Sequence, residues 1–183
     1  MNHQGTKIIE TSRLILRPFV WADAEAMYHN WASDDEVTKF LTWPTHTDVS
    51  ISRMVLSDWI GRYSDENYYQ WAIVPKEFGQ PIGSIAAVHM NERLEKVEIG
   101  YCIGRPWWHQ GITAEALEAV IRYFLEEVGV KRVEARHDPN NPNSGKVMAK
   151  CGMIFEGTQR QADINNQGVC DVCWYGILAS DRK

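Results

Sequence analysis

Long apolar runs are missing from this sequence. Residues 1–10 hold no apolar core behind a basic start, and no stretch approaches the roughly 20 apolar residues that a membrane-spanning helix needs. We therefore expect neither a secretory signal nor a membrane partner, and we expect a cytoplasmic protein.

Cysteine and clustered positive charge are also scarce. The four cysteines of the 183 residues are too few and too unevenly spaced for a disulfide framework, so we expect reduced thiols. Cys170 and Cys173 have the spacing of a metal-binding pair, but no second Cys or His pair accompanies them, and strand alternation would place them on opposite faces. The net charge of −5, with scattered basic residues, argues against a nucleic-acid partner. The sequence therefore predicts no metal and no nucleic acid.

What is present is the composition of an ordinary globular protein, with 44% hydrophobic and 23% charged residues. No repeat, linker or low-complexity tract divides the chain. We expect a single domain over residues 1–183, with an ordered core at about residues 8–180.

Hydrophobic periodicity predicts an α/β fold with a mixed sheet. Thr47 is a candidate cap for the second predicted helix. Apolar spacing of three and four residues predicts helices at residues 21–31, 48–63, 111–128 and 144–150. Apolar runs between turn residues predict strands at residues 13–19, 69–74, 81–89, 96–103, 132–137, 153–161 and 168–178.

The segment 104–116 leads from a strand into a helix and is a candidate anion site. The first N–H groups of a helix have no helical acceptors, and the helix dipole adds partial positive charge there. Gly111 leaves room for a phosphate to approach the backbone, and Pro106 fixes the direction of the chain. The alternative is an ordinary strand-to-helix turn with a small residue for packing.

Four motifs occur in an informative order. They are Glu98-Ile-Gly-Tyr101, Trp107-Trp-His-Gln-Gly-Ile-Thr-Ala-Glu-Ala-Leu117, Asn141-Pro-Asn-Ser144 and Lys150-Cys-Gly-Met-Ile-Phe-Glu-Gly157, after the opening Glu10-Thr-Ser-Arg-Leu-Ile-Leu-Arg-Pro18. Together they resemble the RimJ/RimL-type branch of the GNAT superfamily of N-acetyltransferases over nearly the whole chain. The resemblance implies a mostly antiparallel central sheet of about seven strands, flanked by about four helices, with a V-shaped splay between the fourth and fifth strands.

The resemblance also implies that acetyl-CoA, as co-substrate, lies in that splay. Trp108 and Thr113 depart from the superfamily's general loop pattern, which has Gln or Arg and then Gly or Ala at these positions. Asn141 would bond the pantetheine arm, and Lys146 or Lys150 would reach the outer phosphates; the plain alternatives are a turn asparagine and solvated lysines. The implied cofactor contacts are completed by the backbone of Tyr101, Cys102 and Ile103 and by the loop residues Trp108, His109, Gln110, Gly111, Ile112, Thr113 and Ala114.

Two residues are candidate catalytic groups for acetyl transfer. On the strand 96–103, Glu98 shares a face with Gly100 and Cys102, and a buried carboxylate there would have a raised pKa and act as a base. It would alternatively pair with a neighbouring basic residue. Ser144 would supply a hydroxyl to the departing thiolate or simply cap the last helix. Many relatives place a tyrosine acid where this chain has Met148.

The expected enzyme is therefore an acetyl-CoA-dependent N-acetyltransferase that acts on a primary amine. The acceptor is either a protein N-terminus, such as that of a ribosomal protein, or a small-molecule amine, and residues 36–63 would determine which. The enzyme would be a monomer or a homodimer. Candidate acceptor contacts are the aromatic residues Trp31, Trp43, Trp59, Trp71, Tyr68 and Tyr69. The alternative function is a non-catalytic regulatory protein that binds acyl-CoA.

Overall fold

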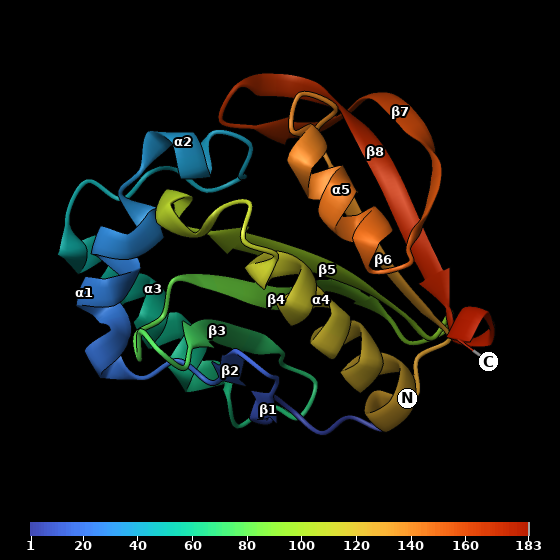
Figure 1. Ribbon diagram of the computed structural model, residues 1–183, viewed down its shortest axis with the longest axis horizontal. Helices are drawn as coiled ribbons and strands as arrows, with labels where there is room; N and C mark the ends of the chain where they lie inside the picture. Colours follow the sequence, from blue (N-terminus) through green and yellow to red (C-terminus); the bar gives the residue numbers. More distant parts are fainter. Residues whose placement is uncertain (183) are drawn as a thin grey trace.

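A computed structural model describes residues 1–182 and contains one eight-stranded sheet in the order β1-β2-β3-β4-β5-β6-β8-β7 (Figure 1). Every neighbouring pair is antiparallel except β5 and β6, so the predicted mixed, mostly antiparallel sheet is confirmed. The strands are β1 (Ile9–Glu10), β2 (Leu14–Arg17), β3 (Gln70–Pro75), β4 (Gly83–Asn91), β5 (Lys96–Ile103), β6 (Arg132–His137), β7 (Ile154–Asn165) and β8 (Gly168–Leu178).

Helices cover both faces of the sheet. The α-helices are α1 (Ala24–Met27), α2 (Asp35–Thr38), α3 (Val49–Arg62), α4 (Ile112–Tyr123) and α5 (Pro142–Lys150). A π-helical turn, Phe124–Val128, extends α4 up to Gly129, so the predicted helix at residues 111–128 is confirmed. The two elements that the sequence did not predict, β1 and α2, are only two and four residues long, too short to produce a periodic signal.

Alternation along β3 shows how the sheet separates two cores. Trp71 and Ile73 pack in the core beneath α4, whereas Ala72 and Val74 pack on the opposite face against α1 and α3. Because successive side chains of a strand point to opposite faces, one strand serves both cores. Figure 1 shows α4 and α5 in front of the sheet.

The parallel pair β5 and β6 opens into a V. Only Lys96–Glu98 of β5 pairs with β6, at residues 132–134; beyond that point β5 continues beside β4, and β6 continues beside β8. The predicted splay between the fourth and fifth long strands is therefore confirmed. The helices α4 and α5 begin beside this opening, which brings both of their N-terminal ends to it (Figure 1).

Two predicted helix caps were wrong by a few residues. The cap of α3 is Asp48 and not Thr47, because the Asp48 carboxylate accepts a hydrogen bond of 2.7 Å from the Ser50 N–H. The N-cap position of α5 is Asn141, and Ser144 lies inside the first turn. A proline at the first helical position, Pro142, starts this helix earlier than the apolar pattern indicated.

Within residues 1–182, no helix has the length and apolar content needed to cross a bilayer.

Candidate active site

The loop before α4 has the backbone geometry of an anion site. Gly111 precedes the helix with a φ of 74°, in the left-handed region where glycine avoids the steric cost of a side chain. His109 also has a positive φ, 60°, which is uncommon for a residue with a side chain. The loop therefore needs support from other parts of the chain to hold this conformation.

That support comes from the first strand region, through a residue that sequence reasoning missed. The Arg13 guanidinium donates to the Gln110 carbonyl at 3.0 Å and pairs with the Glu115 carboxylate at 2.6 Å. Glu115 also accepts hydrogen bonds from the hydroxyls of Thr11 and Ser12 and from the Arg13 N–H. Burial opposes ionisation of Glu115, but these hydrogen bonds outweigh it and lower its pKa to about 2. The first turn of α4 is thus tied to the start of β2.

Trp108 has a role that explains its departure from the general loop pattern. Its indole N–H donates to the Ile103 carbonyl at 2.8 Å, at the end of β5. The side chain therefore joins the loop to the strand that it leaves. The Ile103 carbonyl, one of the backbone groups predicted for the pantetheine arm, thus already accepts one hydrogen bond.

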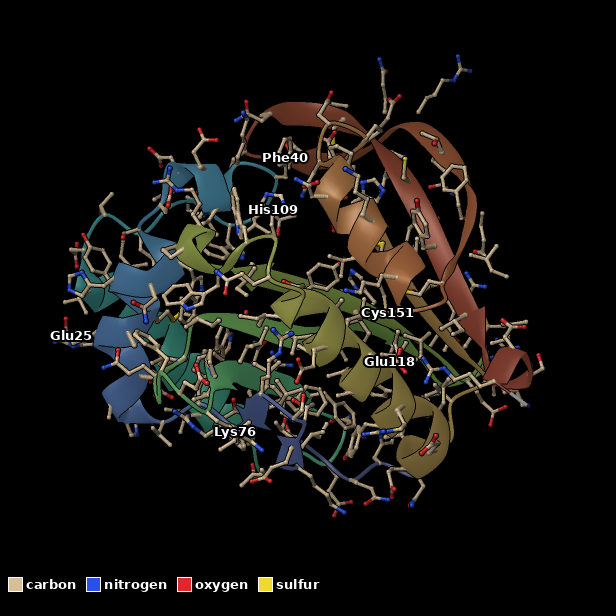
Figure 2. The ribbon with its side chains drawn as sticks, viewed as in Figure 1. Glu25, Phe40, Lys76, His109, Glu118 and Cys151 are labelled. Atoms are coloured by element: carbon tan, nitrogen blue, oxygen red, sulfur yellow. The ribbon has the colours of Figure 1, made fainter. Side chains whose placement is uncertain are left out.

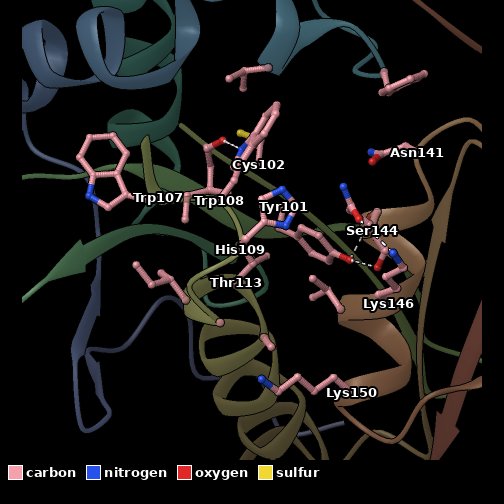
Figure 3. A pocket seen from close by; sticks show the side chains of 18 of the residues that line it. Tyr101, Cys102, Trp107, Trp108, His109, Thr113, Asn141, Ser144, Lys146 and Lys150 are labelled. Atoms are coloured by element: carbon pink, nitrogen blue, oxygen red, sulfur yellow. Dashed lines mark hydrogen bonds between the residues drawn. The ribbon is translucent and has the colours of Figure 1, made fainter. Parts of the chain in front are cut away.

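A cavity of about 320 Å³ lies between β5, the loop before α4 and α5 (Figure 3). Figure 2 labels Phe40 and His109, which line this cavity from separate parts of the chain. Gln110 does not line the cavity, and its side chain instead donates to the Pro106 carbonyl at 2.7 Å. The predicted cofactor residues that do line the cavity are Tyr101, Cys102, Ile103, Trp108, His109, Gly111, Ile112, Thr113, Ala114, Asn141, Lys146 and Lys150.

Polar groups of α5 face this cavity. Asn141 lines it, and among residues 1–182 no partner bonds its side-chain amide. The Lys150 ammonium would lie 3.5 Å from a Cβ built on Gly111, which brings a positive charge next to the start of α4. Figure 3 shows Lys146 and Lys150 on successive turns of α5. An anion beside Gly111 would have the Lys150 ammonium and a helix N-terminus next to it, whereas the Lys146 ammonium donates to the Asn143 side chain at 3.5 Å.

Tyr101 and Ser144 form a hydroxyl pair in the opening of the V. The Tyr101 Oη lies 3.0 Å from the Ser144 Oγ and 3.0 Å from the Ser144 carbonyl oxygen (Figure 3). Burial raises the pKa of Tyr101, so its hydroxyl stays protonated. Met148, at the position of the tyrosine in many relatives, is only 1% exposed and packs in the core. No pattern in the sequence indicated that Tyr101 would meet Ser144.

A second cavity, of about 450 Å³, lies on the other side of the opening. Glu98 lines it and is 6% exposed, as expected for a carboxylate on a largely apolar strand. Residues Phe40, Leu41, Tyr101, Cys102, Asn141 and Ser144 line both cavities. The two cavities therefore adjoin where β5 and β6 separate.

The environment of Glu98 combines the two alternatives that its sequence left open. Its carboxylate pairs with the Arg136 guanidinium of β6 at 2.8 Å. Burial nevertheless raises the pKa of Glu98, against the opposing charges of Arg136 and His89, and the neighbouring Glu134 carboxylate adds to the rise. Glu98 is thus both ion-paired and a better base than an exposed glutamate.

Several other residues of the second cavity were missed because they come from separate elements. Arg136, Asp138 and Asp163 line it from β6, the following loop and β7. Among the six aromatic candidates, Trp43 and Trp59 line the second cavity, and Trp31 and Trp71 are fully buried in the cores. Tyr68 and Tyr69 line an adjoining cavity that also includes Trp59.

The cysteines of β8 have separate neighbours. Cys170 accepts a hydrogen bond from the Asn165 side-chain amide, and Cys173 contacts the Thr158 hydroxyl. In the part of the chain that the structure describes, no group of three or more His, Cys, Asp or Glu side chains is arranged to hold a metal ion.

Two adjoining cavities at the splay of a mixed sheet, one of them at a helix N-terminus, are typical of enzymes that bring a phosphate-bearing donor to an acceptor. A family model described as an acetyltransferase (GNAT) domain matches residues 13–154. The chain belongs to the GNAT acetyltransferase family and is an N-acetyltransferase, as its motifs predicted. GNAT acetyltransferases use acetyl-CoA.

Relatives and solved structures agree with this assignment. The chain is 29% identical over 168 residues to the uncharacterized N-acetyltransferase p20 of Bacillus licheniformis, covering 92% of this chain and 94% of that protein. It is 31% identical over 101 residues to the ribosomal-protein-serine acetyltransferase of Escherichia coli, covering 55% of this chain and 56% of that protein. The crystal structure of a GNAT-family acetyltransferase from Bacillus anthracis superposes with a TM-score of 0.84 at 25% identity, covering 95% and 99% of the two chains.

Proposed function

We propose that this enzyme transfers the acetyl group of acetyl-CoA to a primary amine by direct attack in a ternary complex. The observation that carries the proposal is the junction of the two cavities, which share residues of β5 and of the start of α5. Donor and acceptor in adjoining cavities would meet there without a covalent enzyme intermediate. The whole chain would act as one domain, since the larger of its two cores combines residues from Leu14 to Ile177 and both cores pack on the same sheet.

The first cavity would hold acetyl-CoA. The N–H groups at the start of α4 and the Lys150 ammonium would bind its pyrophosphate, because both present positive charge beside Gly111. Asn141 would donate to or accept from the pantetheine arm through its free side-chain amide. On the edge of β5 that faces β6, pairing ends at Glu98, which leaves the backbone of Tyr101 and Cys102 for the arm.

Glu98 would act as the general base. The nitrogen of a neutral amine forms a bond to the thioester carbonyl carbon, the carbon–sulfur bond then breaks, and the nitrogen loses a proton. A strand rises about 3.3 Å per residue, so three residues separate Glu98 from the junction at Tyr101 by about 10 Å. Glu98 would therefore take the proton through water in the second cavity.

Ser144 would stabilise the thiolate that leaves, with Tyr101 holding it in position. The Tyr101 hydroxyl donates to the Ser144 carbonyl oxygen at 3.0 Å, and the Tyr101 oxygen lies 3.0 Å from the Ser144 Oγ. The Ser144 hydroxyl therefore donates to the Tyr101 oxygen in this structure, and it would turn to the sulfur when the thiolate forms. Tyr101 itself keeps its proton because burial raises its pKa.

Calorimetry with acetyl-CoA, followed by an assay of thiol release with a panel of amines, tests the proposal. Binding together with amine-dependent thiol release is the expected result. Binding without release from any amine would instead favour a non-catalytic acyl-CoA-binding regulator. Failure to bind acetyl-CoA would refute the assignment of the first cavity.

A further inference from the structure

The tip of the β7–β8 hairpin is bonded to the loop that follows α2. The Asn166 side-chain amide donates to the carbonyls of Thr38 and Trp43, each at 2.8 Å. Its backbone N–H donates to the Leu41 carbonyl at 3.1 Å. One residue thus joins segments that lie more than a hundred positions apart, and we call these three hydrogen bonds the Asn166 bridge.

The Asn166 bridge spans the second cavity. On one side of the bridge, Phe40, Leu41 and Trp43 line that cavity, and on the other side Ile164 and Asn165 do. Each hydrogen bond contributes about 1 kcal/mol, so separating the hairpin from the loop would cost a few kcal/mol. The volume of about 450 Å³ lies in the range of small-molecule sites. An acceptor small enough to fit in the second cavity would bind without separating the hairpin from the loop.

Charge in the second cavity is unbalanced. Three carboxylates line it, those of Glu98, Asp138 and Asp163, together with the guanidinium of Arg136 and the imidazoles of His89 and His137. Arg136 is shared, since it pairs with Glu98 at 2.8 Å and with Asp163 at 3.2 Å. Asp138 is 8% exposed, accepts hydrogen bonds from the Asn140 N–H and the Asn165 side chain, and has the Cys170 thiol as a further neighbour. An excess of buried negative charge favours a cationic ligand.

The remaining wall is aromatic. Phe40, Trp43 and Trp59 line the same cavity as the three carboxylates. Aromatic faces attract ammonium groups and cover the methylene chain between them. The cavity thus combines surfaces for an apolar chain with surfaces for positive charge.

We propose that the acceptor is a small aliphatic amine that carries a second positive charge, and not the N-terminus of a protein. The attacked amine lies towards Glu98 and the junction, and the second ammonium lies at Asp138. This inference rests on the proposed acetyl transfer and specifies its acceptor class.

Kinetics of thiol release with matched acceptors test the inference. The probes are a four-carbon diamine, the four-carbon monoamine, and tetrapeptides that begin with serine or alanine. We expect a kcat/KM for the diamine about tenfold above that of the monoamine, the value of one additional ion pair in a partly buried site. Asp138→Asn should lower the kcat/KM for the diamine to the value for the monoamine.

The bridge is tested by Asn166→Ala, with Gln167→Ala as the matched control in the same turn. Asn166→Ala should raise kcat/KM for the tetrapeptides relative to the diamine by about tenfold, because the cavity opens more easily. Gln167→Ala should leave the ratio unchanged, since its side chain makes no bond to the loop after α2. A melting curve of each variant shows whether it is folded.

The outcomes separate this inference from the proposed function. Turnover of the tetrapeptides by the unmodified enzyme, with a diamine no better than the monoamine, would overturn the acceptor class and leave acetyl transfer standing. Acetyl-CoA binding without thiol release from any probe would overturn both.

Discussion

Replacing Glu98 with glutamine is the most direct test of the proposed chemistry. Loss of a general base lowers kcat by about 10²–10⁴. Asp138 and Asp163 line the same cavity and would accept protons through water in its place, so we expect a loss near the lower limit, about 10². That loss corresponds to about 2.7 kcal/mol of transition-state stabilisation. Glutamine keeps the shape of the side chain and removes its charge.

The assay is thiol release as a function of pH. A base works in its deprotonated form, so activity falls as the pH drops through its pKa. Because burial raises the pKa of Glu98, the acid limb of kcat/KM should lie above the value of about 4.3 for an ordinary glutamate. Glu98→Gln should remove the part of this limb that belongs to Glu98 and lower kcat, while the dissociation constant of acetyl-CoA stays unchanged.

Glu134→Gln is the matched control. Glu134 lies directly opposite Glu98 in the pairing of β6 with β5 and is also 6% exposed. It pairs with Lys96 and Arg132 and lines neither of the two cavities. We expect this variant to keep kcat and to shift the acid limb slightly downwards, because a neighbouring negative charge is lost. Equal losses in the two variants, or a Glu98→Gln enzyme that keeps both kcat and the acid limb, would refute the assignment of the base.

Three further predictions concern the hydroxyl pair, the loop and the anchor of α4. Tyr101→Phe should lower kcat by about tenfold, the value of one hydrogen bond. In the double variant with Ser144→Ala it should cause no further loss, and additive losses would contradict a shared role. Tyr175→Phe, on β8, is the control. Gly111→Ala should raise the dissociation constant of acetyl-CoA by about tenfold in calorimetry, since φ is 74°, and unchanged binding would argue against the anion site. Glu115→Gln should lower the free energy of unfolding, measured in urea, by about 3 kcal/mol at neutral pH and by much less near pH 2. The reason is that a carboxylate with a depressed pKa stabilises the fold only while it is ionised. A loss that does not depend on pH would contradict this.

The long elements of the fold were predictable because their signals are local. Alternation on β3 and on β5 and the helical stripe of α4 follow from side-chain geometry alone. The caps were harder, since Thr47 and Asp48 are adjacent and both suit a cap. The splay was expected only through the resemblance, because no residue pattern in β5 indicates that its pairing with β6 ends after Glu98.

The candidate site was predictable where one segment builds it and not where several do. The loop before α4 is continuous, and most of its predicted residues line the first cavity. The contacts Arg13 to Gln110, Tyr101 to Ser144 and Arg136 to Glu98 join residues that are distant in sequence. No periodicity encodes such pairs, because tertiary packing decides which side chains meet.

Strand β5 links the two cavities in a way that its sequence order explains. Glu98 and Gly100 line only the second cavity, Tyr101 and Cys102 line both, and Ile103 lines only the first. Along β5, the proposed acceptor cavity therefore comes first and the proposed donor cavity second. The junction between them lies beyond the residues that pair with β6. At that junction the Tyr101 hydroxyl bonds to Ser144. Any change that extended the pairing of β5 with β6 by three or four residues, to Tyr101 and Cys102, would close the passage and separate the two cavities.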